Sequence, residues 1–174
     1  MDYYVNAPSL GIEHRFSRKL SGNAQVGYFW QSPERGSKVE GPSYNVTLTH
    51  RGEKIIYTLG GQGGYREDFF TAENLGFTKS YRTTGMVTYR LMEKMTTGLS
   101  GSYEWAQSRV TPAGASTTSN RTDNIWSVNG NLNYELLKWL NLSLNVSYRE
   151  DHSNLSYLDY SEFRTLLRIE ARYQ

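Results

Sequence analysis

The sequence contains no cysteine, which excludes a disulfide framework and any Cys-x-x-Cys metal or redox site. It also has no apolar run that approaches the length of about 18 residues that a membrane-spanning helix needs. A helical membrane protein is therefore excluded. Proline is scarce, with 4 residues in a chain of 174. A chain of this length suits one domain, and we expect a single domain over residues 1–174.

A large excess of charge of one sign is lacking as well. The chain has 19 basic and 17 acidic residues, a net charge of +2, and the basic residues are scattered along it. Because a nucleic-acid-binding protein needs a concentrated basic patch, we expect no nucleic-acid partner. No basic segment followed by an apolar one comes after Met1. We therefore expect a leader already removed, a fragment of a longer chain, or a protein that stays inside the cell.

Aromatic residues and glycine are abundant: 14 Tyr, 4 Trp, 6 Phe and 16 Gly, a mixture that favours strands and tight turns. Apolar and polar residues alternate with a period of two. From Leu20 to Gln31, Leu, Gly, Ala, Val, Tyr and Trp occupy one face, and mainly Ser, Asn and Gln occupy the other. The same alternation returns in Tyr44–His50, Met95–Trp105 and Leu140–Arg149. This pattern predicts an all-β chain of antiparallel strands with one apolar face.

The connections between these strands alternate in length. Short ones lie near residues 17–19, 51–54, 91–94 and 136–139, and long polar ones at 32–41, 67–77, 107–123 and 150–161. One end of the sheet should therefore carry tight turns and the other long loops, with residues 2–7 also in a loop. We expect about nine strands, near Pro8–Phe16, Leu20–Gln31, Pro42–His50, Ile55–Arg66, Lys79–Arg90, Met95–Ala106, Asn124–Glu135, Leu140–Arg149 and Glu162–Tyr173.

Aromatic residues on the apolar face are sorted into two rows with aliphatic residues between them. Such rows are typical of a β-barrel in a membrane, where amphipathic rings lie at the level of the lipid headgroups. A strand of about 11 residues tilted by about 45° also spans a bilayer core of about 25 Å. The alternative is a soluble barrel or sandwich, such as a lipocalin-like fold, with the apolar face inside. The predicted membrane-interface aromatics include Tyr28, Trp30, Tyr65, Tyr103, Trp105, Trp126 and Tyr148 at the loop end, and Tyr89, Tyr134 and Tyr173 at the turn end, with His14 and His50 in the turn-end row.

The last strand alternates from Phe163 to Tyr173, which places an aromatic residue one position from the end of the chain. In this it resembles the carboxy-terminal part of a Gram-negative outer-membrane β-barrel. The segments Glu13–Tyr28 and Gly64–Phe77 are similar to those of the β-barrel porin 2 type found with exopolysaccharide export systems. The resemblance implies an antiparallel up-and-down transmembrane barrel in contact with outer-membrane lipid and lipopolysaccharide. It also implies that the barrel-assembly machinery reads the last strand.

An odd strand number leaves one strand without an antiparallel neighbour. The chain would then be part of a larger barrel, pair with another copy or another protein, or close with an odd number of strands. The resemblance implies a porin-like channel or export-associated pore. The alternatives for function are a structural barrel with a plugged lumen, an outer-membrane enzyme and a soluble ligand-binding barrel.

Charged residues on the polar face are the candidates for lining a lumen. They could give a pore that attracts anions, or they could neutralise one another by pairing between strands. Asp151, His152 and Ser153 lie in a predicted loop, but adjacent residues do not make a catalytic triad, so we expect no enzyme activity, cofactor or metal. The predicted lumen-lining residues are Arg15, Arg66, Arg82, Arg90, Glu104, Glu135, Arg149, Arg164, Arg168, Glu170 and Arg172.

Overall fold

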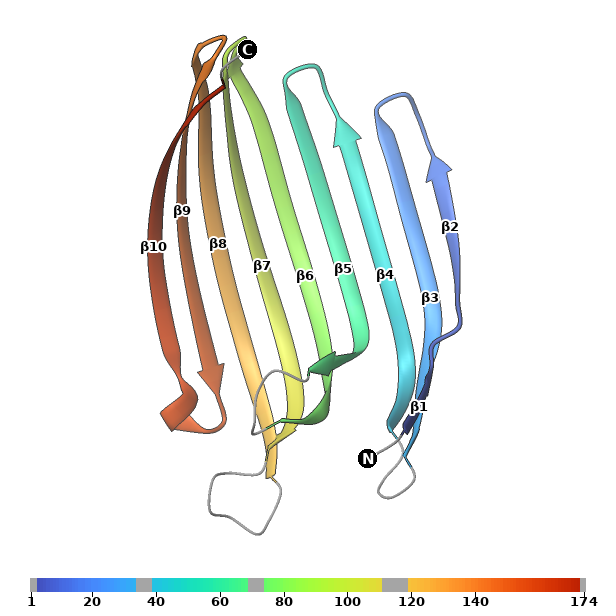
Figure 1. The fold of residues 1–174 in the computed structure, drawn as a ribbon. Helices are drawn as coiled ribbons and strands as arrows, with labels where there is room; N and C mark the ends of the chain where they lie inside the picture. Colours follow the sequence, from blue (N-terminus) through green and yellow to red (C-terminus); the bar gives the residue numbers. More distant parts are fainter. Residues whose placement is uncertain (1–2, 34–38, 69–73, 111–118, 173–174) are drawn as a thin grey trace.

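A computed structural model describes residues 3–33, 39–68, 74–110 and 119–172 of the chain as one antiparallel sheet (Figure 1). The ten strands lie in the order β1-β3-β4-β5-β6-β7-β8-β9-β10, and β2 pairs with β3 beside β1. None of the helical residues described forms a helix long and apolar enough to cross a membrane. The elements are β1 Tyr3–Asn6, β2 Ser9–Arg15, β3 Leu20–Pro33, β4 Val39–Arg51, β5 Ile55–Asp68, β6 Asn74–Met92, β7 Met95–Val110, β8 Ser119–Leu137, β9 Leu140–Ser153, the 3-10 helix η1 Ser156–Leu158, and β10 Tyr160–Ala171.

Strands that follow one another in the sequence are neighbours in the sheet, as the up-and-down prediction requires. The four short connections lie at one end of the sheet, at 16–19, 52–54, 93–94 and 138–139. We call this the turn end, and the opposite end the loop end. The predicted hairpins are confirmed, because each alternating segment meets the next across one of these turns.

The expected loop over residues 2–7 is wrong, since Tyr3–Asn6 forms β1 and pairs with Trp30–Pro33 of β3. The reason lies in the length of β3. Pairing of β2 with β3 ends at Ser9 opposite Gly27, which leaves the rest of that edge of β3 open for β1. Because β1 and β2 cover successive parts of one edge, the sheet is nine strands wide, close to the number predicted from the sequence.

The loops at the loop end are shorter than expected. Residues 67–68, 74–77, 107–110, 119–123 and 150–153 continue the strands, and Val110 still pairs with Ser119. Backbone pairing continues there although the alternation of side chains has stopped. Alternation is needed only where one face meets an apolar medium, whereas backbone hydrogen bonds stabilise a strand whatever its side chains are.

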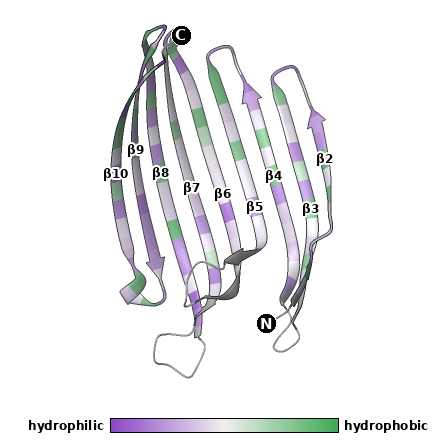
Figure 2. Ribbon diagram, viewed as in Figure 1, coloured by the Kyte–Doolittle hydropathy of each residue, from purple (hydrophilic) through white to green (hydrophobic). Residues whose placement is uncertain are grey.

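The sheet is curved (Figure 1), and hydrophobic and hydrophilic residues are interspersed along its strands (Figure 2). Its two faces differ in polarity and in crowding. Apolar side chains such as Val26, Leu59 and Leu99 are each 60% exposed on one face. All of the buried residues in the described part lie on the other, polar face. Side chains converge on the concave side of a curved sheet, so the polar face is the concave one. The buried residues are Phe29, Gly41, Thr78, Gly98, Glu104, Ala106, Ser108, Asp123 and Asp151.

The apolar face is thus convex, which is the arrangement opposite to the interior of a lipocalin-like barrel. The sheet itself is open. Strands β2 and β10 form its outer edges, and all of their side chains are exposed. Both strands run from the loop end to the turn end (Figure 1). They could therefore not pair antiparallel with each other, and closure through antiparallel pairs needs an odd number of further strands between them.

Candidate functional site

The concave polar face holds the charged side chains that alternation had singled out. Arg15, Arg82, Arg90, Glu104, Glu135, Arg149, Arg164, Arg168, Glu170 and Arg172 all lie at register positions of this face. Arg66 pairs with Thr78 through its backbone, but its side chain lies outside the described part of the structure. The strand register brings the described side chains from six strands onto one surface.

Arg82 and Glu104 form an ion pair between neighbouring strands β6 and β7. Arg82 Nε donates a hydrogen bond of 2.9 Å to Glu104 Oε2, and the Arg82 Nη2 group contacts the same oxygen. Glu104 is 2% exposed, whereas the side chain of Arg82 is 37% exposed. The Glu104 carboxylate is therefore buried among side chains of the concave face, and the Arg82 guanidinium extends from it toward the solvent-exposed side.

A second group of charges lies one strand further, at the loop end of β8 and β9. Arg121 Nε is 2.8 Å from the carboxylate of Asp123, which is itself buried. Asp151 pairs in register with Ile125, which also faces Glu104 across the β7–β8 pair. The guanidinium of Arg149 lies over the ring of Tyr160, with 5.6 Å between the guanidinium carbon and the ring centroid. We call Arg82, Glu104, Arg121, Asp123, Arg149 and Asp151 the charged cluster.

Asp151 is the least satisfied member of the charged cluster. It is 3% exposed, and its Oδ1 has no hydrogen-bond partner among the described atoms. The residue lies two positions beyond Leu140–Arg149, the stretch expected to cross a membrane. Burial raises the pKa of Asp151, and the nearby carboxylates of Asp123 and Asp159 raise it further, against the opposing effect of Arg121 and Arg149. A proton on Asp151 is therefore held more tightly than on a free aspartate.

Two arginines, Arg164 of β10 and Arg172 directly after it, are paired with a residue two positions earlier in the chain instead of with a neighbouring strand. Arg164 contacts Glu162 at 2.5 Å and Arg172 contacts Glu170 at 3.1 Å, both at well-exposed positions of the edge strand. Exposed pairs of this kind contribute little to stability, about 0–1 kcal/mol each. Arg168 lies between them and has no partner within the described residues. Of the two expectations for these charges, pairing accounts for Arg82, Arg164 and Arg172, while Arg168 keeps a free positive charge.

Aromatic rings form lateral contacts across the loop end of the convex face. Tyr44 stacks with Tyr81 at 6.2 Å and Tyr81 with Trp105 at 5.7 Å between ring centroids. Gly63 makes the first contact possible, because a Cβ there would collide with both tyrosine rings. Tyr103 and Trp126 lie 4.4 Å apart, and Tyr28 and Trp30 lie 6.2 Å apart. The rings thus form a row that runs across the strands, together with Tyr148 and Phe163, which pair in register.

Tyr65 does not belong to that row, although the sequence places it there. Its ring stacks on Phe29 at 5.3 Å and covers Gly41, and both of these residues are buried on the polar face. The cause is Gly64, which has a φ of +147° and so breaks the regular alternation of side chains along β5. The ring of Tyr65 therefore lies over the concave side.

At the turn end, the convex face carries Tyr89 and Tyr134, both partly exposed. His14 contacts Phe16 edge to face at 4.8 Å, and His50 lies 6.1 Å from Tyr57. The two histidines lie among aromatic rings, as expected for this row. The predicted terminal aromatic, Tyr173, lies outside the described residues.

Asp151 and His152 point to opposite faces of β9 and do not come together. His152 contacts Glu150 at 2.8 Å on the convex side, whereas Asp151 is buried on the concave side. The carboxylate that His152 contacts is therefore that of Glu150, and the predicted neighbour Asp151 lies on the other face. Within the described ranges, no group of three or more acidic or histidine side chains is placed to hold a metal ion.

Three members of the charged cluster were not predicted to lie on the polar face: Arg121, Asp123 and Asp151. All three fall in segments expected to be long loops. Extending the alternation toward the loop end would have identified them. Every second residue from Ser127 on β8 gives Ile125, Asp123 and Arg121 on the polar face, and the same step from Arg149 on β9 gives Asp151.

The family comparison agrees with this architecture. A family model described as putative beta-barrel porin 2 matches residues 5–173. Comparison with curated proteins finds no match, and neither does comparison with solved structures. The match covers nearly the whole chain, and the antiparallel up-and-down sheet is the fold that such a barrel requires. The chain therefore belongs to the putative beta-barrel porin 2 family and is a barrel protein.

Proposed function

We propose that the chain forms part of a porin-like channel in the bacterial outer membrane, as an ion-conducting or export-associated pore and not as an enzyme. The observation that carries this proposal is the separation of the two faces. The convex face is apolar with a row of aromatic rings at each end, which suits contact with lipid. The concave face is polar and charged, which suits an aqueous lumen.

The strand geometry supports this arrangement in energetic terms. Polar side chains such as those of Arg82 and Glu104 would be costly on a surface exposed to hydrocarbon. A Leu or Val side chain that is 60% exposed, as Leu59 and Val26 are, is also unfavourable in water, although by less. Placing the convex face in lipid and the concave face in water removes both penalties. A closed barrel would also pair the backbone groups along the edges β2 and β10.

The charges of the concave face point to a modest preference for anions. Arg15, Arg90 and Arg168 have no ion-pair partner within the described part, while the carboxylates of Glu104 and Asp123 each lie against an arginine. Glu13 and Glu135 also lack an ion-pair partner among the described residues, but with Arg149 the unpaired guanidinium groups of this face outnumber them. Fixed charges of one sign along a pore favour ions of the other sign.

Reconstitution into planar bilayers tests the proposal. A lumen lined as described should conduct, and the reversal potential in a salt gradient should show more anion than cation passage. A preference for cations would overturn the anion-selective assignment. Absence of conductance, in protein that is shown to be inserted, would instead favour a structural barrel with a plugged lumen.

Membrane insertion needs its own measurement, because it is a separate part of the proposal. Folded outer-membrane barrels migrate on a detergent gel differently before and after boiling. We expect this heat-modifiable migration together with a requirement for detergent. A compact monomer in buffer without detergent would overturn the membrane assignment and the pore with it.

A further inference from the structure

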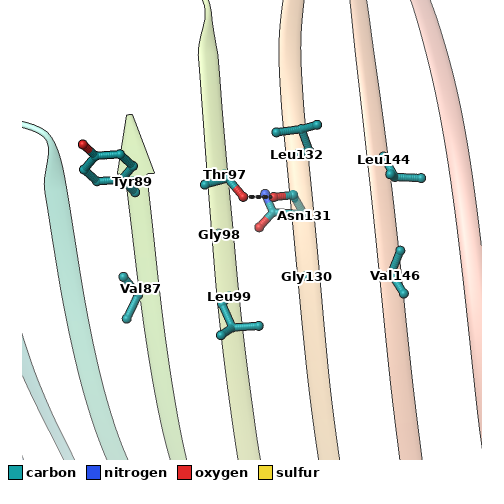
Figure 3. A pocket seen from close by; sticks show the side chains of 10 residues that line it. All are labelled: Val87, Tyr89, Thr97, Gly98, Leu99, Gly130, Asn131, Leu132, Leu144 and Val146. Carbon is teal, nitrogen blue, oxygen red and sulfur yellow. Dashed lines mark hydrogen bonds between the residues drawn. The ribbon is translucent and has the colours of Figure 1, made fainter. Parts of the chain in front are cut away.

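A hollow lies on each face of the sheet, and the two hollows differ in chemistry. The one on the convex face, shown in Figure 3, has a volume of about 370 Å³ and aliphatic sides such as Leu99, Leu132 and Val146. The hydroxyl of Thr97 there donates a hydrogen bond of 2.9 Å to the backbone carbonyl of Asn131 (Figure 3). This hollow is therefore mainly apolar, as a surface in contact with lipid requires.

The second hollow lies on the concave face at the turn end, and its volume is about 360 Å³. Strands β7, β8 and β9 supply most of its lining. Glu170 of β10 also lines it, and Arg172 contacts Glu170 at 3.1 Å, so these two charges neutralise each other. We call this hollow the turn-end pocket and define it by its other polar residues on these strands and in the preceding turn: Lys94, Thr96, Asn133, Glu135, Asn141 and Ser143.

The polar side chains that define the turn-end pocket are free to bind a ligand. Within the described part of the chain, none of the six makes a side-chain hydrogen bond or an ion pair. The Lys94 ammonium and the Glu135 carboxylate remain unpaired, although the Glu135 N–H donates a hydrogen bond of 2.8 Å to the Lys94 carbonyl. An ion of one sign would meet a like charge here, whereas a ligand that carries both signs can satisfy both groups.

Glu135 sets this hairpin apart from the two before it. At each of the first three turns, the backbone carbonyl of a lysine accepts a hydrogen bond of 2.7 or 2.8 Å from the next hairpin. The donors and their lysines are Arg51 with Lys19, Arg90 with Lys54, and Glu135 with Lys94. The neighbour of the lysine is thus an arginine twice and a carboxylate only at the turn-end pocket. The opposite charges are a property of this hairpin and not of the turn type.

A short peptide matches the order of these groups. Lys94 and Glu135 lie on adjoining hairpins, and neighbouring strands are about 4.8 Å apart. An extended dipeptide is about 7 Å long and carries an ammonium group at one end, a carboxylate at the other and a peptide group between them. The carboxamide of Asn133 both donates and accepts hydrogen bonds, as a peptide group does. A dipeptide can therefore reach both charges while its peptide group meets a carboxamide.

We propose that the turn-end pocket binds a small peptide-like zwitterion, with its ammonium group at Glu135, its carboxylate at Lys94 and its amide group against Asn133. The inference rests on the proposed function in one respect, because the concave face must be open to water. It adds the class of solute that this face retains. The hydroxyls of Thr96 and Ser143 provide further hydrogen-bonding groups in the same space.

Equilibrium dialysis of the detergent-purified protein with labelled glycylglycine tests the inference. Two analogues of similar size serve as competitors: N-acetylglycylglycine, which lacks the ammonium group, and glycylglycinamide, which lacks the carboxylate. We expect each analogue to bind about tenfold more weakly than glycylglycine, because each leaves one charge of the pocket without a partner. Equal competition by all three compounds, or no retention of glycylglycine, would overturn the site.

Variants at the two charges should change this preference in different ways. Glu135→Arg installs the residue present at the equivalent positions Arg51 and Arg90, so the sheet should still fold, and it should remove the preference over N-acetylglycylglycine. Glu135→Gln gives the same test if the arginine variant does not fold. Lys94→Gln should instead remove the preference over glycylglycinamide. Lys54→Gln, in the equivalent turn of another hairpin, should leave binding unchanged.

Two results with these variants would contradict the assignment: equal effects of Lys94→Gln and Lys54→Gln, or an unaltered preference for glycylglycine when Glu135 is replaced. Conduction is measured separately. A chain that conducts ions but retains no glycylglycine contradicts this inference alone, and one that binds glycylglycine without conducting contradicts the pore alone.

Discussion

Arg82 and Glu104 face each other across β6 and β7, with Arg82 Nε donating a 2.9 Å hydrogen bond to a carboxylate that is almost completely buried. The two partners are unequal, because the guanidinium remains partly exposed and the carboxylate does not. The pair therefore joins two strands in the crowded part of the concave face. The free energy of unfolding lost when this ion pair is broken should depend on which of the two side chains is removed.

Arg82→Ala should destabilise the fold more than Glu104→Gln. The first change leaves a buried carboxylate without its arginine, and we expect a loss of about 2–3 kcal/mol in the free energy of unfolding. The second leaves a partly solvated arginine and should cost about 1 kcal/mol. Urea unfolding in lipid vesicles measures both. Equal losses would contradict the assignment of the buried partner.

Gly64→Ala should destabilise the sheet, because Gly64 has a φ of +147° and an added Cβ would lie 2.8 Å from the Cβ of Ser43. Strained backbone of this type costs about 1–3 kcal/mol. Gly61→Ala is the matched control, since its Cβ would meet nothing within 4 Å. The same urea titration should show a lower unfolding midpoint for Gly64→Ala and almost no change in the midpoint for Gly61→Ala. A similar midpoint for both variants would show that the unusual φ is not required.

Asp151→Asn should change how stability depends on pH. Burial and the nearby Asp123 raise the pKa of Asp151 above its ordinary value of 3.8. The folded state then binds the proton more tightly than the unfolded state, so this residue lowers stability as the pH rises from about 3.8 through the raised pKa. The asparagine variant lacks that loss and should become more stable relative to the unaltered protein over this range. Unfolding free energies at several pH values test this, and parallel curves would contradict it.

Asp123→Asn provides the contrast to that experiment. Asp123 lies against Arg121 at 2.8 Å, so the neutral substitution weakens an ion pair that the fold uses. We expect a loss of about 1 kcal/mol at neutral pH, where Asp151→Asn should not destabilise. Opposite signs for the two neighbouring aspartates would distinguish a paired carboxylate from one with an unsatisfied oxygen.

Arg168→Glu should shift the ion preference of the proposed pore toward cations. Arg168 has no ion-pair partner among the described residues, so reversing its charge changes the field of the lumen directly. Arg168→Gln should give a smaller shift in the same direction. Reversal potentials in a salt gradient measure both, and Lys19→Glu controls for the same change of charge in a turn. An effect of Lys19→Glu as large as that of Arg168→Glu would place the selectivity outside the lumen.

Alternation from Leu20 to Trp30 was enough to predict strand type, face and neighbour, because a period of two fixes which side of the sheet each residue occupies. The assignment of Arg82 and Glu104 to the polar face follows from the same alternation. The alternation alone does not determine which charged side chains form ion pairs. Arg82 with Glu104 is a cross-strand pair, whereas Arg164 pairs along its own strand with Glu162, because β10 has a neighbour on one side only.

Tyr65 and Asp151 show where sequence reasoning fails. For Tyr65, the alternation is interrupted by the backbone of Gly64, and nothing in the spacing of apolar residues records a φ angle. For Asp151, the strand continues after the apolar pattern ends, because backbone pairing does not depend on side-chain polarity. Both residues lie at the loop end, where the pattern of apolar residues is weakest.

By itself, the sequence determined an all-β meander with one apolar and one polar face, since these follow from local periodicity and turn chemistry. Only the tertiary structure decided which face is concave, that β1 and β2 cover successive parts of one edge of β3, and that Arg82 meets Glu104 across two strands. Curvature and the partners of each side chain depend on contacts between segments far apart in the chain. No local pattern of residues encodes them.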